Sequence, residues 1–197
     1  MKFSAMSDRE LLEKISAGDK KSFGAFYDKF QSQVYRTAFG YFHNNSDAEE
    51  IVQDVFVEVF RSAGKFKNNS NLSTWLYRIT VNKSLDRIRF QKSAKRFSFF
   101  SAIFFDEDNG LKDNIPDSTD HGIEADKKES EKIIFRAMDK LAENQRTAFV
   151  LTQVEDLSGN EAAEIMGTTA KALESLIQRA KANLRKELGE MYNTRRK

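Results

Sequence analysis

The chain has 197 residues, of which 40% are hydrophobic and 31% charged, and its formal net charge is only +2. This length allows one domain or two small ones with real hydrophobic cores. The absence of cysteine excludes disulfides and cysteine metal sites, and His43 and His121 are the only histidines available for a histidine-based site. Because no phosphate loop, nucleophile elbow or HExxH pattern occurs either, we expect no catalytic residues, no cofactor and no metal site.

The distribution of charge is more informative than its sum. Basic residues gather in residues 83–96 and 171–186, and acidic residues gather between them in residues 106–120. This arrangement fits two basic modules joined by an acidic connector. The sequence contains no signal-peptide pattern and no apolar run of membrane-spanning length, so we expect a cytoplasmic protein with no stable membrane insertion.

Helical periodicity extends over almost the whole chain outside the connector. We therefore predict an all-α fold of two small helical domains joined by a flexible linker, the second with a helix-turn-helix. The predicted boundaries are 1–96 for the first module, 97–130 for the linker, which holds the only proline, and 131–197 for the second module. Within the linker, the segment FSFFSAIFF (97–105) is apolar enough that we expect it to pack on this protein or on a partner.

The first two predicted helices carry apolar stripes of the core type. A capping box at Ser7–Glu10 starts a short helix that stops at Gly18. A longer helix follows, and His43 is expected near a helix end. We interpret the regularly spaced apolar residues of this longer helix as core: Phe23, Phe26, Tyr27, Phe30 and Val34.

The third predicted helix has an apolar face and an acidic face. A second capping box, Ser46–Glu49, is expected to start it. Its expected buried residues are Ala48, Ile51, Val52, Val55, Phe56, Val59 and Phe60. The opposite side carries an acidic stripe, almost free of basic partners in the sequence, with Gln53 at its edge: Asp47, Glu50, Asp54 and Glu58. The stripe is either a solvated face or a docking surface for a basic or amide-rich helix of another protein, because uncompensated like charges weaken an isolated helix.

The fourth predicted helix, STWLYRITVNKSLDRIR (73–89), contains the only tryptophan. We expect Ser73 or Thr74 to cap it. Its apolar face changes sides partway along, from the Trp75 side to the Tyr77 side. This change leaves a polar ridge, which is either the solvated face below a core tryptophan or a functional surface: Trp75, Arg78, Asn82, Asp86 and Arg89.

The second module ends in a predicted helix-turn-helix. A capping box at Ser158–Glu161 opens a short helix, Gly167 ends it, and Thr168 or Thr169 caps a longer helix. The apolar stripe of that longer helix is Leu173, Leu176, Ile177, Ala180, Leu184 and Leu188. The other side carries side chains that can read bases or hold phosphates, the alternative being a solvated helix face: Lys171, Glu174, Ser175, Gln178, Arg179, Lys181 and Arg185.

Four segments in this order resemble the bacterial RNA polymerase sigma factors of the extracytoplasmic-function (ECF) group. They are DAEEIVQDVFVEVF (47–60), STWLYRITVNKSLDRIR (73–89), LAENQRTAFVLTQVEDLSGNEAAEIMG (141–167) and ALESLIQRAKANLRKEL (172–188). The resemblance covers nearly the whole chain apart from the linker and the tails. It implies a transcription initiation factor that binds core RNA polymerase and promoter DNA, and usually an anti-sigma factor.

The resemblance also implies roles for particular residues. The residues that match the family's core-polymerase docking segment are Asp47, Glu50, Gln53 and Asp54. Those that match the segment capturing flipped bases of the minus-ten element, with nearby cations, are Lys67, Asn68, Asn69, Ser70, Trp75, Arg78, Asn82, Lys83, Arg87 and Arg89. The minus-thirty-five element would be read by Lys171, Glu174, Ser175, Gln178, Arg179 and Lys181.

The sequence departs from the family at the start of the last helix. Many relatives have Thr-Val and a basic residue where this chain has Ala172, Leu173 and Glu174. A carboxylate there replaces a basic contact, so a minus-thirty-five sequence cannot be borrowed from relatives. Two alternatives stay open: a helix-turn-helix regulator that recognises duplex DNA without polymerase, and a helical interaction scaffold with no nucleic-acid role.

Overall fold

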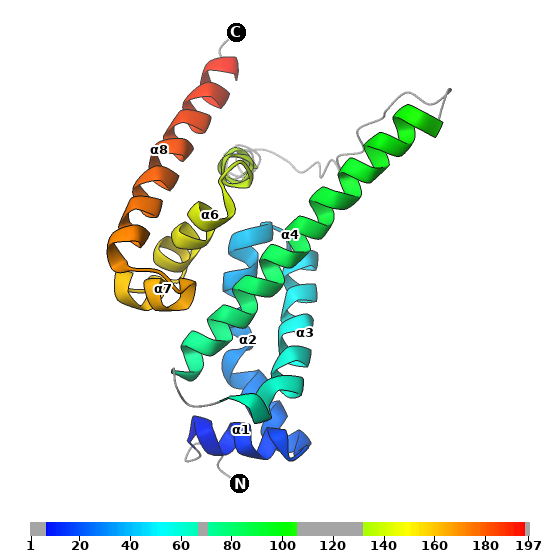
Figure 1. The fold of residues 1–197 in the computed structure, drawn as a ribbon, viewed down its shortest axis with the longest axis vertical. Coiled ribbons are helices and arrows are strands. Elements are labelled where there is room, and N and C mark those ends of the chain that lie inside the picture. Colours follow the sequence, from blue (N-terminus) through cyan, green and yellow to red (C-terminus); the bar gives the residue numbers. More distant parts are fainter. Residues whose placement is uncertain (1–6, 67–70, 106–131, 196–197) are drawn as a thin grey trace, which may run out of the picture.

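The predicted all-α fold is confirmed in the computed structural model, which describes residues 7–66, 71–105 and 132–195 (Figure 1). Every regular element within these ranges is a helix. The first module contains α1 (Asp8–Ser16), α2 (Lys20–Phe42), α3 (Asn45–Ser62), the 3-10 turn η2 (Ala63–Lys65) and α4 (Leu72–Phe105). The second module contains a helix at residues 132–139, α6 (Glu143–Phe149), the π-helical turn η3 (Val150–Val154), α7 (Gly159–Met166) and α8 (Ala170–Arg195).

Side-chain caps begin several of the helices, although not always at the predicted residue, whereas α6 begins at Ala142 without one. The capping boxes at Ser7 and Ser158 are both present. The predicted box at Ser46 is wrong, because Asn44 caps α3 by accepting a hydrogen bond from the Asp47 amide at 2.7 Å. Similarly, the Asn71 side chain accepts from the Ser73 amide at 3.1 Å, so α4 begins before the predicted Ser73 or Thr74 cap. Asparagine is as good an N-cap as serine, and in both cases the earlier residue takes the role.

The helix α4 is much longer than predicted. It continues to Phe105 and so includes residues 97–105, which were expected to belong to the linker. No glycine or proline occurs between Leu72 and Phe105 to stop it. The expected packing of the phenylalanine side chains in 97–105, and the remainder of the linker from 106 to 131, lie outside the described part of the chain.

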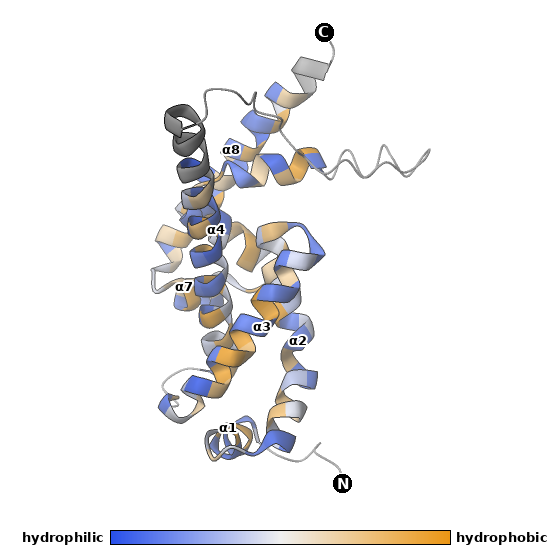
Figure 2. Cartoon of the chain, turned by 90° about the vertical axis from the view of Figure 1, so that its right-hand side faces the viewer, coloured by the Kyte–Doolittle hydropathy of each residue, from blue (hydrophilic) through white to orange (hydrophobic). Residues whose placement is uncertain are grey.

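The first hydrophobic cluster lies among α1, α2, α3 and the start of α4. Its members include Phe26, Val55 and Leu76, which are fully buried. Most of the predicted apolar face of α3 is buried there. The prediction that Phe60 is buried is wrong, because 47% of its surface is exposed. It lies at the margin of the cluster, where its ring and that of Phe23 are nearly perpendicular, with their centroids 5.5 Å apart. Figure 2 shows hydrophobic residues alternating with hydrophilic ones along α3, whereas α8 is mainly hydrophilic.

Two further hydrophobic clusters join the modules, a contact that was not predicted from the sequence. One contains Tyr41 and Ile88 of the first module together with residues of α6, α8 and the 132–139 helix. The other contains Tyr77 and Val81 of α4 together with residues of α6, α7 and α8. The second module thus packs directly on α2 and α4 (Figure 1).

Close approach at this interface depends on Gly40. A Cβ atom at position 40 would lie 3.0 Å from Cγ1 of Val150, tighter than ordinary van der Waals contact. Glycine therefore lets α2 approach η3 more closely than any other residue would.

A buried polar network crosses the same interface. One carboxylate oxygen of Glu155 accepts hydrogen bonds from Arg36 at 2.9 Å and from the Tyr77 hydroxyl at 3.0 Å. The other oxygen is buried without a hydrogen-bond partner among the described residues. Burial and the neighbouring carboxylate raise the pKa of Tyr77 above its usual value, so the phenol remains a donor. Because buried polar groups are costly to leave unpaired, this network favours one docking geometry.

A second buried network lies beside it. The Tyr41 hydroxyl donates to Thr147 Oγ1 at 2.9 Å, and Arg146 donates to the carbonyls of Met138 and Tyr41 at 2.8 and 3.3 Å. His43 ends α2 in the left-handed conformation, as expected of a helix end, and its ring stacks on Phe135 at 4.0 Å. Burial lowers the pKa of His43 to about 4, so the ring is neutral at neutral pH.

Ion pairs close the margin of the interface. Arg78 of α4 donates to the Glu164 carbonyl at 2.6 Å, and its guanidinium is 3.8 Å from the Glu164 carboxylate. Arg89 donates to Glu143 of α6 at 2.7 Å and to Asp86 of its own helix at 3.2 Å. The hydrogen bond from Arg89 holds the pKa of Glu143 below its usual value of 4.5.

We predict that Arg89→Ala will raise the pKa of Glu143 towards that usual value. In the wild type the folded-state pKa is lowered, so the pair stabilises the folded protein above about pH 4.5 and is lost as the pH falls through the lowered value. A carbon-13 NMR titration of the Glu143 carboxyl group measures this directly. Lys92→Ala removes a nearby charge without removing a hydrogen bond, so it should cause a smaller change; equal pKa values in wild type and Arg89→Ala would contradict the assignment.

Candidate nucleic-acid interface and docking surface

The acidic stripe of α3 faces α4 more closely than the sequence indicated. Glu50 forms an ion pair with Arg87, and Asp47 lies 3.4 Å from the same guanidinium. Glu58 pairs with Lys83 at 3.2 Å. The expectation that this stripe lacks basic partners is therefore wrong for these three carboxylates, because helix packing brings the cations of α4 beside them.

Asp54 differs from the rest of the stripe. Its side chain is exposed, and the described residues form no ion pair or hydrogen bond with it. An exposed carboxylate without an intramolecular partner stays hydrated, and a cationic group of another molecule can replace its bound water.

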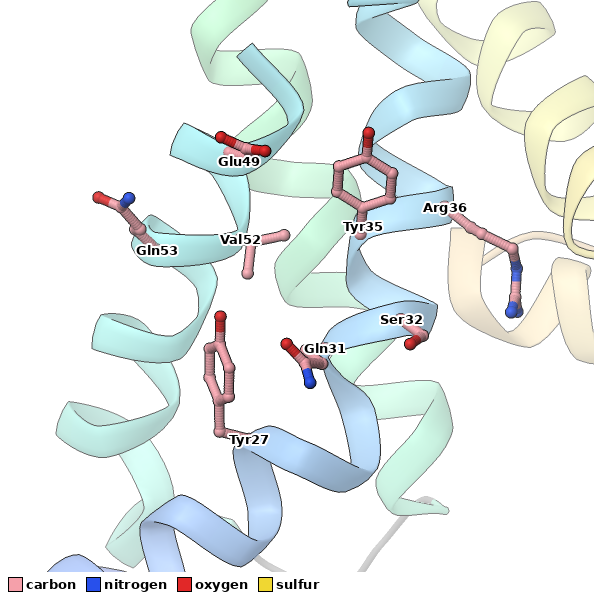
Figure 3. Close-up of a pocket in the computed structure, with 8 residues that line it drawn as sticks. All are labelled: Tyr27, Gln31, Ser32, Tyr35, Arg36, Glu49, Val52 and Gln53. Carbon is pink, nitrogen blue, oxygen red and sulfur yellow. The ribbon is translucent and has the colours of Figure 1, made fainter. Parts of the chain in front are cut away.

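A groove runs beside Gln53, between α2 and α3 (Figure 3). Its volume is about 520 Å³. Tyr27, Gln31 and Tyr35 of α2 face Glu49 and Gln53 of α3 across it (Figure 3). Phenol and amide groups beside apolar ring surfaces suit contact with another protein.

The α2 side of this groove was not predicted from the sequence. Tyr27 was assigned to the core, but it is only half-buried. The spacing of Tyr27, Gln31 and Tyr35 at i, i+4 and i+8 was the available signal, because it defines a face beside the Phe26 and Phe30 stripe.

The polar ridge of α4 is partly core and partly surface. Trp75 is half-buried, and its ring packs on Phe66 at 5.2 Å. Asn82 is exposed, and the described residues offer its side chain no hydrogen bond. Arg78 and Arg89 lie on the same ridge but are engaged by the second module. The four predicted loop residues Lys67, Asn68, Asn69 and Ser70 lie outside the described ranges.

Lys83 and Arg87 do not share that ridge. They contact the carboxylates of α3 rather than those of the second module. The Nε atom of Arg87 is buried without a hydrogen-bond partner among the described residues. The four predicted minus-ten cations that belong to α4 are thus divided between two sides of the helix, and each of these four has a carboxylate partner.

The predicted helix-turn-helix is present. Gly167 ends α7 in the left-handed conformation, with φ of 61°, and Thr169 caps α8 by accepting from the Ala172 amide at 3.2 Å. Leu173, Ala180 and Leu184 are buried, whereas the remaining residues of the predicted apolar stripe are half-buried. The two helices are therefore held in place by packing, with a glycine turn between them.

The proposed base-reading side of α8 faces solvent. Lys171, Glu174, Ser175, Gln178 and Arg179 are exposed, and Lys181 is half-buried. Among the described residues, none of the three cations in this set has an ion pair. Ser175 donates to the Lys171 carbonyl at 3.1 Å, which leaves its hydroxyl oxygen free to accept. This face is sterically open, in contrast to the ridge of α4.

The described residues contain no cluster of His, Cys, Asp or Glu that could hold a metal ion. No helix within those residues is long and apolar enough to span a membrane.

Comparison with known proteins assigns both modules to one family. Residues 26–94 match the family model for sigma-70 region 2, and residues 131–184 match the model for sigma-70 region 4. The chain is 29% identical over 184 residues to the RNA polymerase sigma-H factor of Pseudomonas aeruginosa, covering 92% of this chain and 93% of that protein. It is 30% identical over 177 residues to the ECF RNA polymerase sigma-E factor of Haemophilus influenzae, covering 89% and 92%.

Solved structures show the same fold. CnrH in complex with the cytosolic domain of CnrY superimposes with a TM-score of 0.62, at 23% identity, over 93% of this chain and 97% of that one. The sigma factor RpoE of Bartonella quintana, in complex with the anti-sigma factor NepR, gives a TM-score of 0.58 at 23% identity over 86% and 98%. The two family models in their order, and relatives matched over nearly their full length, show that the chain belongs to the ECF group of RNA polymerase sigma factors.

Proposed function

We propose that the two modules of this ECF sigma factor bind different parts of the transcription initiation complex. As a sigma factor, the protein binds core RNA polymerase, directs it to promoters and helps to melt the minus-ten element. Residues 1–96 would dock on core polymerase and bind the minus-ten element, residues 97–130 would connect the modules, and residues 131–197 would bind the minus-thirty-five element. The proposal assigns no catalytic step and no cofactor to this chain, and it places the protein in the cytoplasm with its polymerase.

The observation that carries the minus-ten assignment is the polar ridge that continues along α4 beyond a half-buried tryptophan. Separated strands offer base faces and hydrogen-bonding edges, which the Trp75 ring and the Asn82 amide can use. Stacking of a base on an aromatic ring contributes about 1–3 kcal/mol, comparable with the cost of unstacking that base. The loop residues 67–70 would complete the site, and Arg78, Lys83, Arg87 and Arg89 would neutralise phosphates.

The docking surface for core polymerase would centre on Asp54 and Gln53. Asp54 supports this assignment because its carboxylate is exposed and unpaired among the described residues. Asp47 and Glu50 would contribute at one end of the surface, although Arg87 already contacts both. The groove between α2 and α3 extends the surface to Tyr27 and Gln31, which would pack against the same partner.

The exposed side of α8 would enter the major groove at the minus-thirty-five element. Gln178 can pair with adenine, Glu174 can accept from cytosine and Ser175 can bond to several bases. Lys171, Arg179 and Lys181 would hold phosphates or guanine. Because Glu174 replaces a basic residue found in many relatives, the preferred sequence would differ from theirs.

Neither alternative from the sequence is favoured. A polymerase-independent regulator and a helical scaffold both leave the region 2 match over residues 26–94 without a role. We also propose that an anti-sigma factor controls this protein, because RpoE of Bartonella quintana, a structure with the same fold, was solved bound to one.

Run-off transcription tests the function as a whole. Purified core RNA polymerase is incubated with and without the protein on a library of genomic upstream fragments. Transcripts that appear only with the protein are the expected result, and their start sites identify both promoter elements. If the protein gives no transcripts and also does not bind core, that result favours the duplex-binding regulator instead.

For the docking surface, we predict that Asp54→Lys weakens binding to core polymerase, because it places a positive charge in the acidic stripe. Fluorescence anisotropy with labelled protein and purified core gives the dissociation constant. Asp28→Lys makes the same charge change at an exposed position of α2 outside the stripe and should bind core normally. Unchanged affinity of Asp54→Lys for core would remove the assignment.

For strand capture, we predict that Asn82→Ala impairs open-complex formation while core binding is retained. The exposed amide is lost, and no hydrogen bond within the described structure depends on it. Permanganate footprinting reports unpaired thymines in the minus-ten element, with Ser93→Ala, at an exposed position of the same helix, as the control. Wild-type reactivity in the Asn82→Ala complex would count against the ridge as a capture site.

A further inference from the structure

A group of exposed lysines surrounds the turn between α1 and α2, at the end of the first module where α3 also ends (Figure 1). Lys14 lies in the last turn of α1, and Lys20 and Lys21 begin α2. Lys65 belongs to η2, which follows α3. In the described part of the chain, none of these four ammonium groups forms an ion pair. We call these four residues the lysine patch.

Packing and hydrogen bonds hold the backbone of the patch in place. A Cβ atom at Gly64 of η2 would lie 3.5 Å from the Cβ atom of Ser16, so η2 rests against the end of α1. Between the two helices, the Asp19 carboxylate accepts hydrogen bonds from the Lys21 amide at 3.1 Å and from the Ser22 hydroxyl at 2.6 Å. The lysines therefore extend into solvent from a backbone that is fixed on both sides of the turn.

The carboxylates around the patch are already engaged. Each carboxylate of α1 has a partner: Asp8 pairs with Lys29, Glu10 with the cap residue Ser7, and Glu13 with Arg9. Asp19 is the one carboxylate within the turn, and its oxygens cap α2. The patch thus keeps a net positive charge. This is the reverse of α4, where each candidate phosphate-binding cation already has a carboxylate partner.

The patch lies next to the proposed strand-capture site. Lys65 is followed by Phe66, and the ring of Phe66 packs on Trp75 with their centroids 5.2 Å apart. The loop 67–70, to which we assigned flipped bases, begins directly after Phe66. A strand whose bases meet Trp75 and this loop can therefore continue along η2 to the lysines.

We propose that the lysine patch binds phosphates of the single strand that continues beyond the captured minus-ten bases. This inference rests on the proposed minus-ten role of Trp75 and the loop. Proteins hold single strands by combining aromatic stacking surfaces with cations that follow the backbone. Here Trp75 supplies the stacking surface, and the patch supplies cations that no carboxylate of the described residues already holds.

Most of the patch lies outside the part of the chain that matches the family model. The match to sigma-70 region 2 begins at residue 26, whereas Lys14, Lys20 and Lys21 precede it. Contacts to phosphates fix the position of a strand and carry no sequence information. The patch would therefore add affinity for the melted strand without changing which promoter is preferred.

A double substitution provides the test. Lys20→Gln with Lys65→Gln removes one charge from α2 and one from η2, at exposed positions where the fold does not depend on the ammonium groups. The matched control is Lys132→Gln with Arg136→Gln, which removes two exposed cations without ion pairs among the described residues, outside every proposed binding surface. Lys20→Arg with Lys65→Arg keeps both charges and should bind as the wild type does.

The readout is binding of labelled single-stranded oligonucleotides by the holoenzyme formed with purified core polymerase, measured by anisotropy over a range of salt concentrations. One oligonucleotide ends at the minus-ten element, and two others are extended beyond it at one end or at the other. We expect the wild type to bind one extended strand more tightly than the short strand, and the glutamine variant to lose this gain. The slope of log affinity against log salt should fall by about 0.7 for each phosphate contact removed.

Several results would overturn the proposal. One is a glutamine variant that equals the control variant in affinity and in salt slope, and another is an arginine variant as weak as the glutamine variant. A loss that depends on the base sequence of the extension would mean that the patch reads bases. A loss seen only with duplex DNA, or one that accompanies weaker binding to core, would assign the patch to duplex or to protein instead.

Separate readouts distinguish this proposal from the proposed function. Preference of the wild-type holoenzyme for the minus-ten strand over a strand of scrambled sequence reports base capture, and its absence would sink the proposed minus-ten role. If that preference is present but extension gives no gain, the patch proposal fails and the proposed function stands. A glutamine variant that keeps the sequence preference and loses the gain from extension supports both.

Asn82→Ala gives the complementary result. It removes an amide from the base-capture site and leaves the lysines unchanged, so it should weaken the preference for the minus-ten sequence while the salt slope stays as in the wild type. The glutamine variant should do the opposite. A fall in salt slope of the same size in both variants would contradict the separation of base capture from phosphate binding.

Discussion

The burial of Glu155 between Arg36 and Tyr77 is the interaction on which the arrangement of the two modules depends. This carboxylate belongs to the turn between η3 and α7, whereas both of its partners belong to the first module. A buried charge without such partners would be strongly destabilising. The pairing therefore ties the start of the helix-turn-helix to α2 and α4, and the shared clusters on either side complete the contact.

Because of this docking, the two proposed DNA surfaces differ in whether their cations are paired with carboxylates. Each of the four candidate cations of α4 has a carboxylate partner, supplied by α3 for Lys83 and Arg87 and by the second module for Arg78 and Arg89. The cations on the recognition side of α8 have no such partners among the described residues. A basic helix neutralised from two sides attracts phosphate weakly, because its field is already compensated.

Local features were predictable because they depend on neighbours in the chain. The capping boxes at Ser7 and Ser158, the glycine turn at Gly167 and the apolar stripes of α2 and α3 all follow from helical spacing. The start of α3 was misplaced because two candidate caps, Asn44 and Ser46, lie close together. Phe60 was wrongly predicted to be buried because it lies where the apolar face of α3 reaches the margin of the core. Such boundaries depend on small differences in free energy, which spacing does not resolve.

By itself, the sequence determined the helical class, the helix-turn-helix, the family resemblance and the ridge from Trp75 to Arg89, because periodicity, caps and motif order are written along the chain. Only the tertiary structure decided which ion pairs form, such as Glu58 with Lys83 and Glu143 with Arg89. It also decided that the absence of a side chain at Gly40 leaves room for Val150. These partners are far apart in sequence, and their pairing depends on how the helices pack. Charges that look uncompensated along one helix are compensated by another, since packing free energy rather than sequence spacing selects the neighbours.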